Sequence, residues 1–136
     1  LLVKLDTNGS YPDMLDLLLQ ERLVDCVALD IKAPLRPRRY EEVAGIPCSE
    51  AMMERIGRSC SLLLNSGIDV VFRSTLLKGI HASEDVEEMA AMASDRLVLQ
   101  RFRPERTLRP LAAGAFSDRE LHALASRYSC VVCSSG

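Results

Sequence analysis

Short apolar runs, each followed by a polar cluster, recur four times along the chain. The first run is Leu1–Leu5 and the last is Leu97–Leu99, and segments with helical spacing of apolar residues separate the runs. Strands that alternate with helices are typical of a parallel α/β sheet with short right-handed connections. We therefore predict parallel strands, neighbours in this order with helices on one outer face, over residues 2–6, 26–31, 69–74 and 96–101.

Helical spacing of apolar residues predicts four helices, over residues 12–21, 49–65, 83–93 and 117–128. A serine precedes or begins each segment and can accept a hydrogen bond from a free N–H of the first turn. These predicted capping residues are Ser10, Ser49, Ser83 and Ser117. The last apolar stretch, Cys130–Cys133, has a β-like pattern.

The length and the first residue indicate part of a larger barrel. A complete eight-unit (βα) barrel takes about 250 residues, or roughly 30 for each unit, so 136 residues hold about four units. Residue 1 already lies inside a strand-like run. We expect an α/β fold in which residues 1–136 form a single domain, the carboxyl-terminal part of a partial TIM-like barrel.

Composition favours a protein of the cytoplasm. The apolar fraction is 48%, the charged fraction is 26% and the net charge is −2, values close to those of globular domains. This balance does not favour nucleic-acid binding, and no apolar run approaches the ~20 residues of a membrane span. The five cysteines are an odd number without regular spacing, which favours a reducing compartment.

Polar side chains at the predicted strand ends are the candidates for chemistry. Asp30 and Lys32 stand two residues apart and are expected to share one face, and Asp6 and Thr7 end the preceding strand. Two converging carboxylates repel each other unless a cation, an amine or a shared proton lies between them. Arg73, at the end of the third strand, has the guanidinium group that suits a ligand carboxylate.

Structural explanations compete with each of these interpretations. Asp30 and Lys32 would then only neutralise each other, Asp6–Gly9 would form a turn, and Arg73 would join an ion pair at the rim. His81 would be a loop histidine near a helix start rather than a general base. The spacing of Cys130 and Cys133 matches half of a zinc or redox site, but no second pair accompanies it.

Four segments together resemble one family, the radical S-adenosylmethionine (radical SAM) activases of glycyl-radical enzymes. They are Leu5–Gly9 (LDTNG), Val27–Pro34 (VALDIKAP), Phe72–Leu76 (FRSTL) and Leu99–Pro104 (LQRFRP). Within the family, their order and spacing most resemble the activating proteins of anaerobic ribonucleoside-triphosphate reductase. The resemblance covers about residues 1–128.

The resemblance implies an oxidoreductase with a partial barrel of about six βα units. In such enzymes a CxxxCxxC motif binds a 4Fe–4S cluster, an electron donor such as flavodoxin or ferredoxin reduces it, and S-adenosylmethionine yields the radical that activates the partner. This chain contains neither that motif nor the GGEP segment, so it has no cluster ligands and no catalytic residue of its own. It would correspond to strands three to six.

The resemblance also implies roles for six residues. Asp6, Thr7, Asp30 and the carbonyl of Ala28 match a monovalent cation site beside S-adenosylmethionine. Lys32 and Arg73 match strand-end positions near this cofactor or the incoming glycine loop, so Asp6, Thr7, Asp30, Lys32 and Arg73 are the candidate cofactor-binding residues. The last strand departs from the formate-lyase type of activase, because Gln100 and Phe102 stand near the place of its histidine.

Two other functions remain compatible with the sequence. The chain could be a non-catalytic α/β half-barrel that binds a partner or a small anion at its strand ends. It could also come from another radical SAM enzyme, one that modifies nucleosides or peptides, because the strand-end residues are partly shared.

Overall fold

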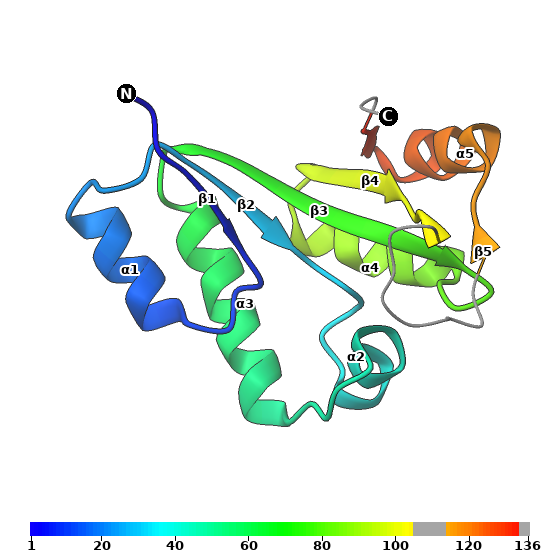
Figure 1. The fold of residues 1–136 in the computed structure, drawn as a ribbon, viewed down its shortest axis with the longest axis horizontal. Coiled ribbons are helices and arrows are strands. Elements are labelled where there is room, and N and C mark those ends of the chain that lie inside the picture. The colour runs from blue at the N-terminus through cyan, green and yellow to red at the C-terminus, as the bar shows by residue number, and fades with distance from the viewer. Residues whose placement is uncertain (105–113, 134–136) are drawn as a thin grey trace.

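The protein forms an α/β fold around one parallel sheet, as a computed structural model of residues 1–104 and 114–133 describes it (Figure 1). Its central strands are β1 (Lys4–Thr7), β2 (Cys26–Asp30), β3 (Asp69–Lys78) and β4 (Leu97–Arg101). They are neighbours in this order, and each adjacent pair is parallel. The predicted fold class and strand order are confirmed, and so are the strand positions except for the end of β3, which lies beyond the predicted residue 74. Residues 105–113 and 134–136 of the expected single domain lie outside the described residues.

The helices are α1 (Pro12–Gln20), α2 (Pro37–Ala44), α3 (Glu50–Leu64), α4 (Ser83–Met92) and α5 (Asp118–Tyr128). Four of them confirm the predicted segments to within a few residues. The sequence prediction missed α2, although Pro37 begins it and Gly45 ends it in the left-handed region at φ +73°, an arrangement common at helix ends. Its apolar stripe is short, with Tyr40 as its buried residue.

Two of the four predicted capping serines are wrong. Ser49 accepts a hydrogen bond from the Met52 N–H (3.1 Å), and Ser117 forms a reciprocal capping box with Glu120. By contrast, α1 is preceded by Tyr11 without a side-chain cap, and Ser10 instead bonds to Asn8. α4 begins with Ser83 as its first helical residue, so Ala82 stands at the cap position, and its N–H donates to the Asp85 carboxylate.

Two short strands, β5 and β6, extend the sheet beyond the four predicted strands. β6 (Val131–Val132), within the β-like stretch, pairs in parallel with β4. β5 (Gly114–Ala115) pairs antiparallel with Leu77 and Lys78 of β3. Because β4 already pairs with β3 as far as Leu76, the two partners together carry β3 to Lys78 rather than to a point near residue 74. No helix in the described part of the chain is long and apolar enough to cross a membrane.

The register of the sheet separates an apolar face from a polar one. Side chains alternate along each strand, and one face carries the buried residues Val27, Leu29, Phe72, Leu97 and Leu99, which join one core cluster with buried residues of all five helices. The other face carries Asp6 opposite Ala28, and Asp30 opposite Arg73. The helices therefore cover the apolar face, and the polar face remains for chemistry.

Candidate functional site

The polar face of the sheet brings Asp6, Asp30 and Arg73 together. The Nη2 of Arg73 lies 3.5 Å from the Oδ1 of Asp6, and its Nε lies 3.4 Å from the Oδ1 of Asp30. Since both nitrogens belong to one guanidinium group, the two carboxylates lie within about 10 Å of each other, the order of a Debye length. The guanidinium thus supplies positive charge between two carboxylates that would otherwise repel.

Arg73 is held in this position by the pairing of three strands. It stands opposite Asp30 on β2 and Val98 on β4, and its side chain is only 22% exposed. Contrary to the sequence prediction, Arg73 does not end its strand, because β3 continues for five residues to Lys78. It still lies level with the carboxyl end of β2, because Asp30 is the last residue of that shorter strand.

Asp30, Lys32 and Arg73 line a cavity of about 390 Å³ on this face, which Thr75 and Gln100 also line. Lys32 lies two residues beyond the end of β2, so the expected strand alternation does not place it. Instead the chain continues past the strand with one more ladder bond, from the Ile31 N–H to the Arg73 carbonyl. The cavity therefore lies beside the carboxyl-terminal parts of β2, β3 and β4.

Thr7 and Ala28 are placed less favourably for the predicted cation site. The hydroxyl of Thr7 accepts a hydrogen bond from the Gly9 N–H (3.0 Å), so it forms part of the turn after β1. Ala28 is fully buried in the middle of β2, with β1 and β3 on its two sides. A carbonyl in such a strand points toward its neighbour in the sheet, which leaves one lone pair for a cation. Their role as cation ligands stays a prediction.

The turn after β1 is packed tightly against α3. Gly9 has φ +78°, and a Cβ at this position would stand 3.1 Å from the Cδ1 of Leu29. Its carbonyl accepts a hydrogen bond from the buried Ser59 hydroxyl (2.7 Å). The structural reading of Asp6–Gly9 as a turn is therefore confirmed only in part, because Asp6 and Thr7 still belong to β1 and the turn follows them. This turn fixes the strand end that presents Asp6.

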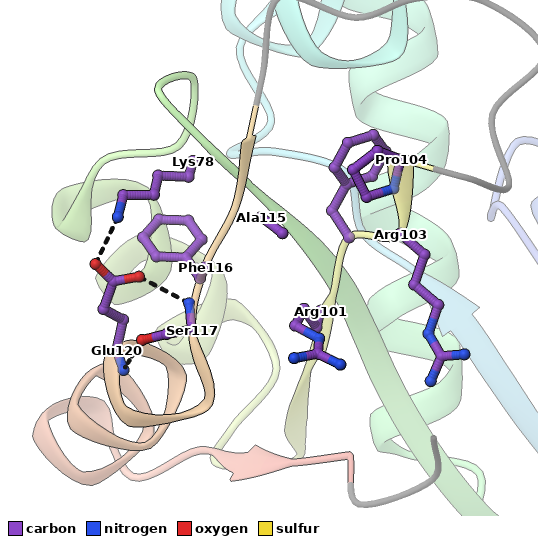
Figure 2. Close-up of a pocket in the computed structure, with 9 residues that line it drawn as sticks. Lys78, Arg101, Arg103, Pro104, Ala115, Phe116, Ser117 and Glu120 are labelled. Carbon is purple, nitrogen blue, oxygen red and sulfur yellow. Dashed lines mark hydrogen bonds and ion pairs between the residues drawn. The ribbon is translucent and has the colours of Figure 1, made fainter.

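A second cavity, of about 420 Å³, lies beside the end of β3 and the start of α5 (Figure 2). Lys78 and Arg101 give it a basic lining, but Lys78 pairs with Glu120 (2.6 Å) and Arg101 with Asp118 (3.4 Å). Arg103 also has a partner. The Nε of Arg73, by contrast, has no hydrogen-bond partner, so the second cavity is a weaker candidate for an anionic ligand than the one beside Arg73.

The cysteines do not gather into a metal site. The described part of the chain holds no group of three or more His, Cys, Asp or Glu side chains that could bind a metal ion, and the five cysteines are free. Burial raises the pKa of the Cys60 thiol to about 11 and raises that of Cys130. A 4Fe–4S cluster needs clustered thiolates, so these residues do not fit one.

The site is also held by residues whose part in it the sequence analysis did not identify. Tyr40 is buried, and burial raises the pKa of its hydroxyl to about 12. Its oxygen accepts a weak hydrogen bond from the Lys32 N–H (3.5 Å). His81, expected to be a loop histidine, is only 7% exposed and contacts the Lys32 carbonyl. The one feature of the sequence that could have indicated this role is an aromatic residue, Tyr40, in an otherwise polar segment.

Comparisons with known proteins find similarity in both sequence and structure. No protein-family model matches the chain. It is 30% identical over 108 residues to a protein of Methanocaldococcus jannaschii described as a "Putative glycyl-radical enzyme activating enzyme". This match covers 76% of the chain and 43% of the relative, so the chain spans less than half of that protein's length. The similarity supports the resemblance to glycyl-radical activases.

The structural match shows the fold. A crystal structure of a domain of pyruvate-formate lyase-activating enzyme from Bacteroides vulgatus superposes with a TM-score of 0.67. It covers 98% of this chain and 81% of that domain, at 11% sequence identity. The arrangement of parallel strands and helices is thus that of an activase domain and agrees with part of a TIM-like barrel.

Proposed function

We propose that this chain is the carboxyl-terminal part of a radical SAM enzyme that activates an anaerobic ribonucleoside-triphosphate reductase. The sequence relative supports the general kind of enzyme, and the four motifs that resemble reductase activases support the partner. The missing part would carry the CxxxCxxC motif and receive electrons from flavodoxin or ferredoxin. The cysteines described above do not fit the 4Fe–4S cluster, so no step through it is assigned to them.

One observation carries the proposed S-adenosylmethionine site, namely the buried Nε of Arg73. This nitrogen has no hydrogen-bond partner, because its 3.4 Å contact with Asp30 brings the charges close without hydrogen-bond geometry. Leaving a buried charged donor unsatisfied is costly. If the guanidinium group turns toward the cavity, the carboxylate of S-adenosylmethionine would accept this hydrogen bond, and guanidinium groups suit such carboxylates.

The other side chains of the cavity would complete recognition of the same molecule. Asp30 and Asp6 accept hydrogen bonds, which suits the ammonium group and the hydroxyls of S-adenosylmethionine. Lys32 would face its carboxylate or the incoming glycine loop. The monovalent cation proposed at Asp6, Thr7, Ala28 and Asp30 would compete with Arg73 for the two carboxylates, so its binding would require Arg73 to turn toward the ligand.

The decisive experiment uses the parent protein with its preceding strands. After anaerobic reconstitution it should contain a stoichiometric 4Fe–4S cluster, release 5′-deoxyadenosine and install a glycyl radical on the reductase, seen by electron paramagnetic resonance. Release of 5′-deoxyadenosine without a radical on the reductase would point to the nucleoside- or peptide-modifying alternative. No deoxyadenosine and no binding of S-adenosylmethionine would favour the non-catalytic module.

A further inference from the structure

His81 makes two hydrogen bonds that fix its protonation state. Its Nδ1 accepts from the Leu77 N–H (2.8 Å), so that nitrogen carries no proton. Its Nε2 lies 2.8 Å from the carbonyl oxygen of Lys32, and only an Nε2–H can donate there. The ring is therefore neutral with its proton on Nε2. Burial lowers the pKa of His81, in agreement with this state.

These contacts hold the segment between β2 and α2 at the point where Lys32 enters the cavity. Lys32 and His81 are 49 positions apart in the sequence. The carbonyl of Lys32 is bound by His81, and its N–H points to the Tyr40 oxygen. The backbone of Lys32 is thus contacted from two other elements, while its side chain remains exposed and lines the cavity with Asp30 and Arg73.

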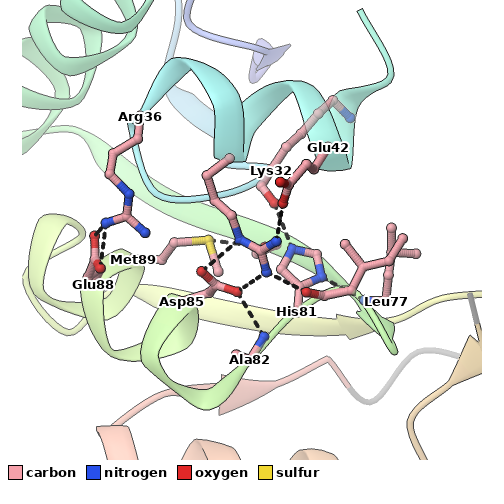
Figure 3. Close-up of polar contacts among 12 residues, drawn as sticks. Lys32, Arg36, Glu42, Leu77, His81, Ala82, Asp85, Glu88 and Met89 are labelled. Atoms are coloured by element: carbon pink, nitrogen blue, oxygen red, sulfur yellow. Dashed lines mark hydrogen bonds and ion pairs between the residues drawn. The ribbon is translucent and has the colours of Figure 1, made fainter.

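The turn that carries His81 is itself fixed by an ion pair of the buried Asp85 with a partly exposed partner (Figure 3). Arg39, on α2, binds both carboxylate oxygens of Asp85, on α4, and also the Ile80 carbonyl. Asp85 in turn accepts from the Ala82 N–H (2.8 Å). The residues on either side of His81 are therefore anchored to α2 and α4, so the imidazole ring has little freedom to leave Lys32.

We propose that His81 is a positioning residue of the candidate site, which holds the Lys32 backbone so that the Lys32 ammonium faces the ligand cavity beside Arg73. The role of Lys32 toward a ligand rests on the proposed function, whereas the link between His81 and Lys32 rests on the contacts above. His81 does not touch the cavity and acts only through Lys32.

Protonation of His81 should release this link. A second ring proton on Nδ1 would face the Leu77 N–H, so two donors would oppose each other and the ring would have to move. The charged groups near the ring are Asp85 of α4, which favours protonation, and Arg39 of α2, which opposes it. The other groups around the contact between His81 and Lys32 are uncharged. They are the backbone groups of Lys32 and Leu77 and the neutral hydroxyl of Tyr40.

Nuclear magnetic resonance of the ¹⁵N-labelled wild-type parent protein tests the link without any substitution. At pH 7.5 the two-bond ¹H–¹⁵N spectrum should show the Nε2–H tautomer for His81. As the pH falls, the amide signals of Lys32 and Leu77 should shift with the His81 ring, at a midpoint below 6.5. The Nδ1–H tautomer, or a Lys32 amide shift that does not change as His81 titrates, would overturn the proposal. The exposed His122 is an internal control.

A double-mutant cycle in the parent protein tests whether His81 acts through Lys32. We expect His81→Phe, which keeps the ring but removes both nitrogens, to weaken S-adenosylmethionine binding by about tenfold. In the Lys32→Ala background the same substitution should change binding less than about twofold. An equal loss in both backgrounds would show a general structural effect and overturn the proposal.

Two further variants complete the cycle. His81→Gln retains a donor that can reach the Lys32 carbonyl and should recover part of the lost affinity, whereas His122→Phe should bind as the wild type does. If the wild-type parent binds no S-adenosylmethionine, the proposed function fails. The tautomer and the shared titration of His81 and Lys32 then still decide whether His81 positions this residue.

Discussion

The Nε of Arg73 lies 3.4 Å from the Oδ1 of Asp30 and yet makes no hydrogen bond to it. The pair is held by register, since Arg73 and Asp30 stand opposite each other in the sheet. Their charges attract, but a buried donor of the guanidinium group stays unsatisfied. A site of this kind gains more from a ligand carboxylate than a fully bonded ion pair would.

Replacement of Arg73 should therefore affect ligand binding more than stability. Arg73→Gln removes the guanidinium group, and we expect S-adenosylmethionine binding by the parent protein to fall by at least about tenfold, the effect of one charge-assisted hydrogen bond. Isothermal titration measures this loss. Arg36→Gln is the matched control, because Arg36 forms an exposed pair with Glu88 away from the cavity. Equal binding by both variants would contradict the assigned role.

Asp30→Asn tests the predicted cation site. The substitution keeps the shape of the side chain but removes the charge that would hold a monovalent cation beside Asp6. We expect weaker binding of S-adenosylmethionine in the parent protein and loss of any dependence on potassium or sodium. Titrations in potassium, sodium and tetramethylammonium salts at constant ionic strength separate this effect from screening. Binding that is unchanged in all three salts would argue against the site.

The buried pair of Arg39 and Asp85 should contribute strongly to stability. Burial acts to raise the pKa of Asp85, but hydrogen bonds from Arg39 and the Ala82 N–H outweigh it and hold this pKa below its ordinary value. Asp85→Ala would leave the Arg39 guanidinium partly buried without this partner, at a cost of about 3 kcal/mol in the free energy of unfolding. Urea denaturation measures the loss.

Glu88→Ala is the control for that substitution. It lies on the same helix, α4, and removes an ion pair whose two side chains are about half exposed. Such pairs contribute about 0–1 kcal/mol. A loss as large as that of Asp85→Ala would show that the stability of α4, rather than the buried pair, is being measured.

Stability should fall as the pH drops below 6.5, because burial lowers the pKa of His81 from this ordinary value. Above pH 6.5 the ring is neutral in both states and the contribution is complete. Below it, the unfolded chain binds a proton that the folded chain does not, so the free energy of unfolding decreases until the folded pKa is reached. At pH 5.5 the loss is at most about 1.4 kcal/mol.

Urea denaturation at pH 7.5, 6.5 and 5.5 measures this slope. We expect it to be reduced in His81→Phe and retained in His122→Phe. Asp85 does not contribute to this slope, because its pKa lies below 3.8 and therefore outside the range from pH 5.5 to 7.5. A slope that persists unchanged in His81→Phe would assign the effect to other groups.

The 136-residue chain by itself should bind no 4Fe–4S cluster and cleave no S-adenosylmethionine. Its cysteines are scattered in sequence, and Cys130 and Cys133 supply at most two thiolates, fewer than a cluster requires. Anaerobic reconstitution, iron and sulfide assays, and chromatography of 5′-deoxyadenosine measure both properties. A stoichiometric cluster on this chain would disprove the assignment of the cluster ligands to a missing segment.

The sequence was sufficient to predict the four main strands and every helix except α2, because this information is local. Apolar residues recur every second position in strands and every three or four positions in helices. The polar residues at the strand ends then indicated Asp6, Asp30 and Arg73 as a group. Parallel strands bring their carboxyl ends to one edge whatever the details of packing, so this convergence follows from the order of elements alone.

The tertiary structure decided how these residues are held. Lys32 lies beyond its strand and is placed by Tyr40 and His81. β3 extends past Arg73 because β4 pairs with it as far as Leu76 and β5 pairs with its last two residues. The contact of Lys32 with His81 joins positions 49 apart, which no periodic pattern encodes. Such contacts depend on how α2 and the turn before α4 pack across the sheet ends, and packing is a property of the whole chain.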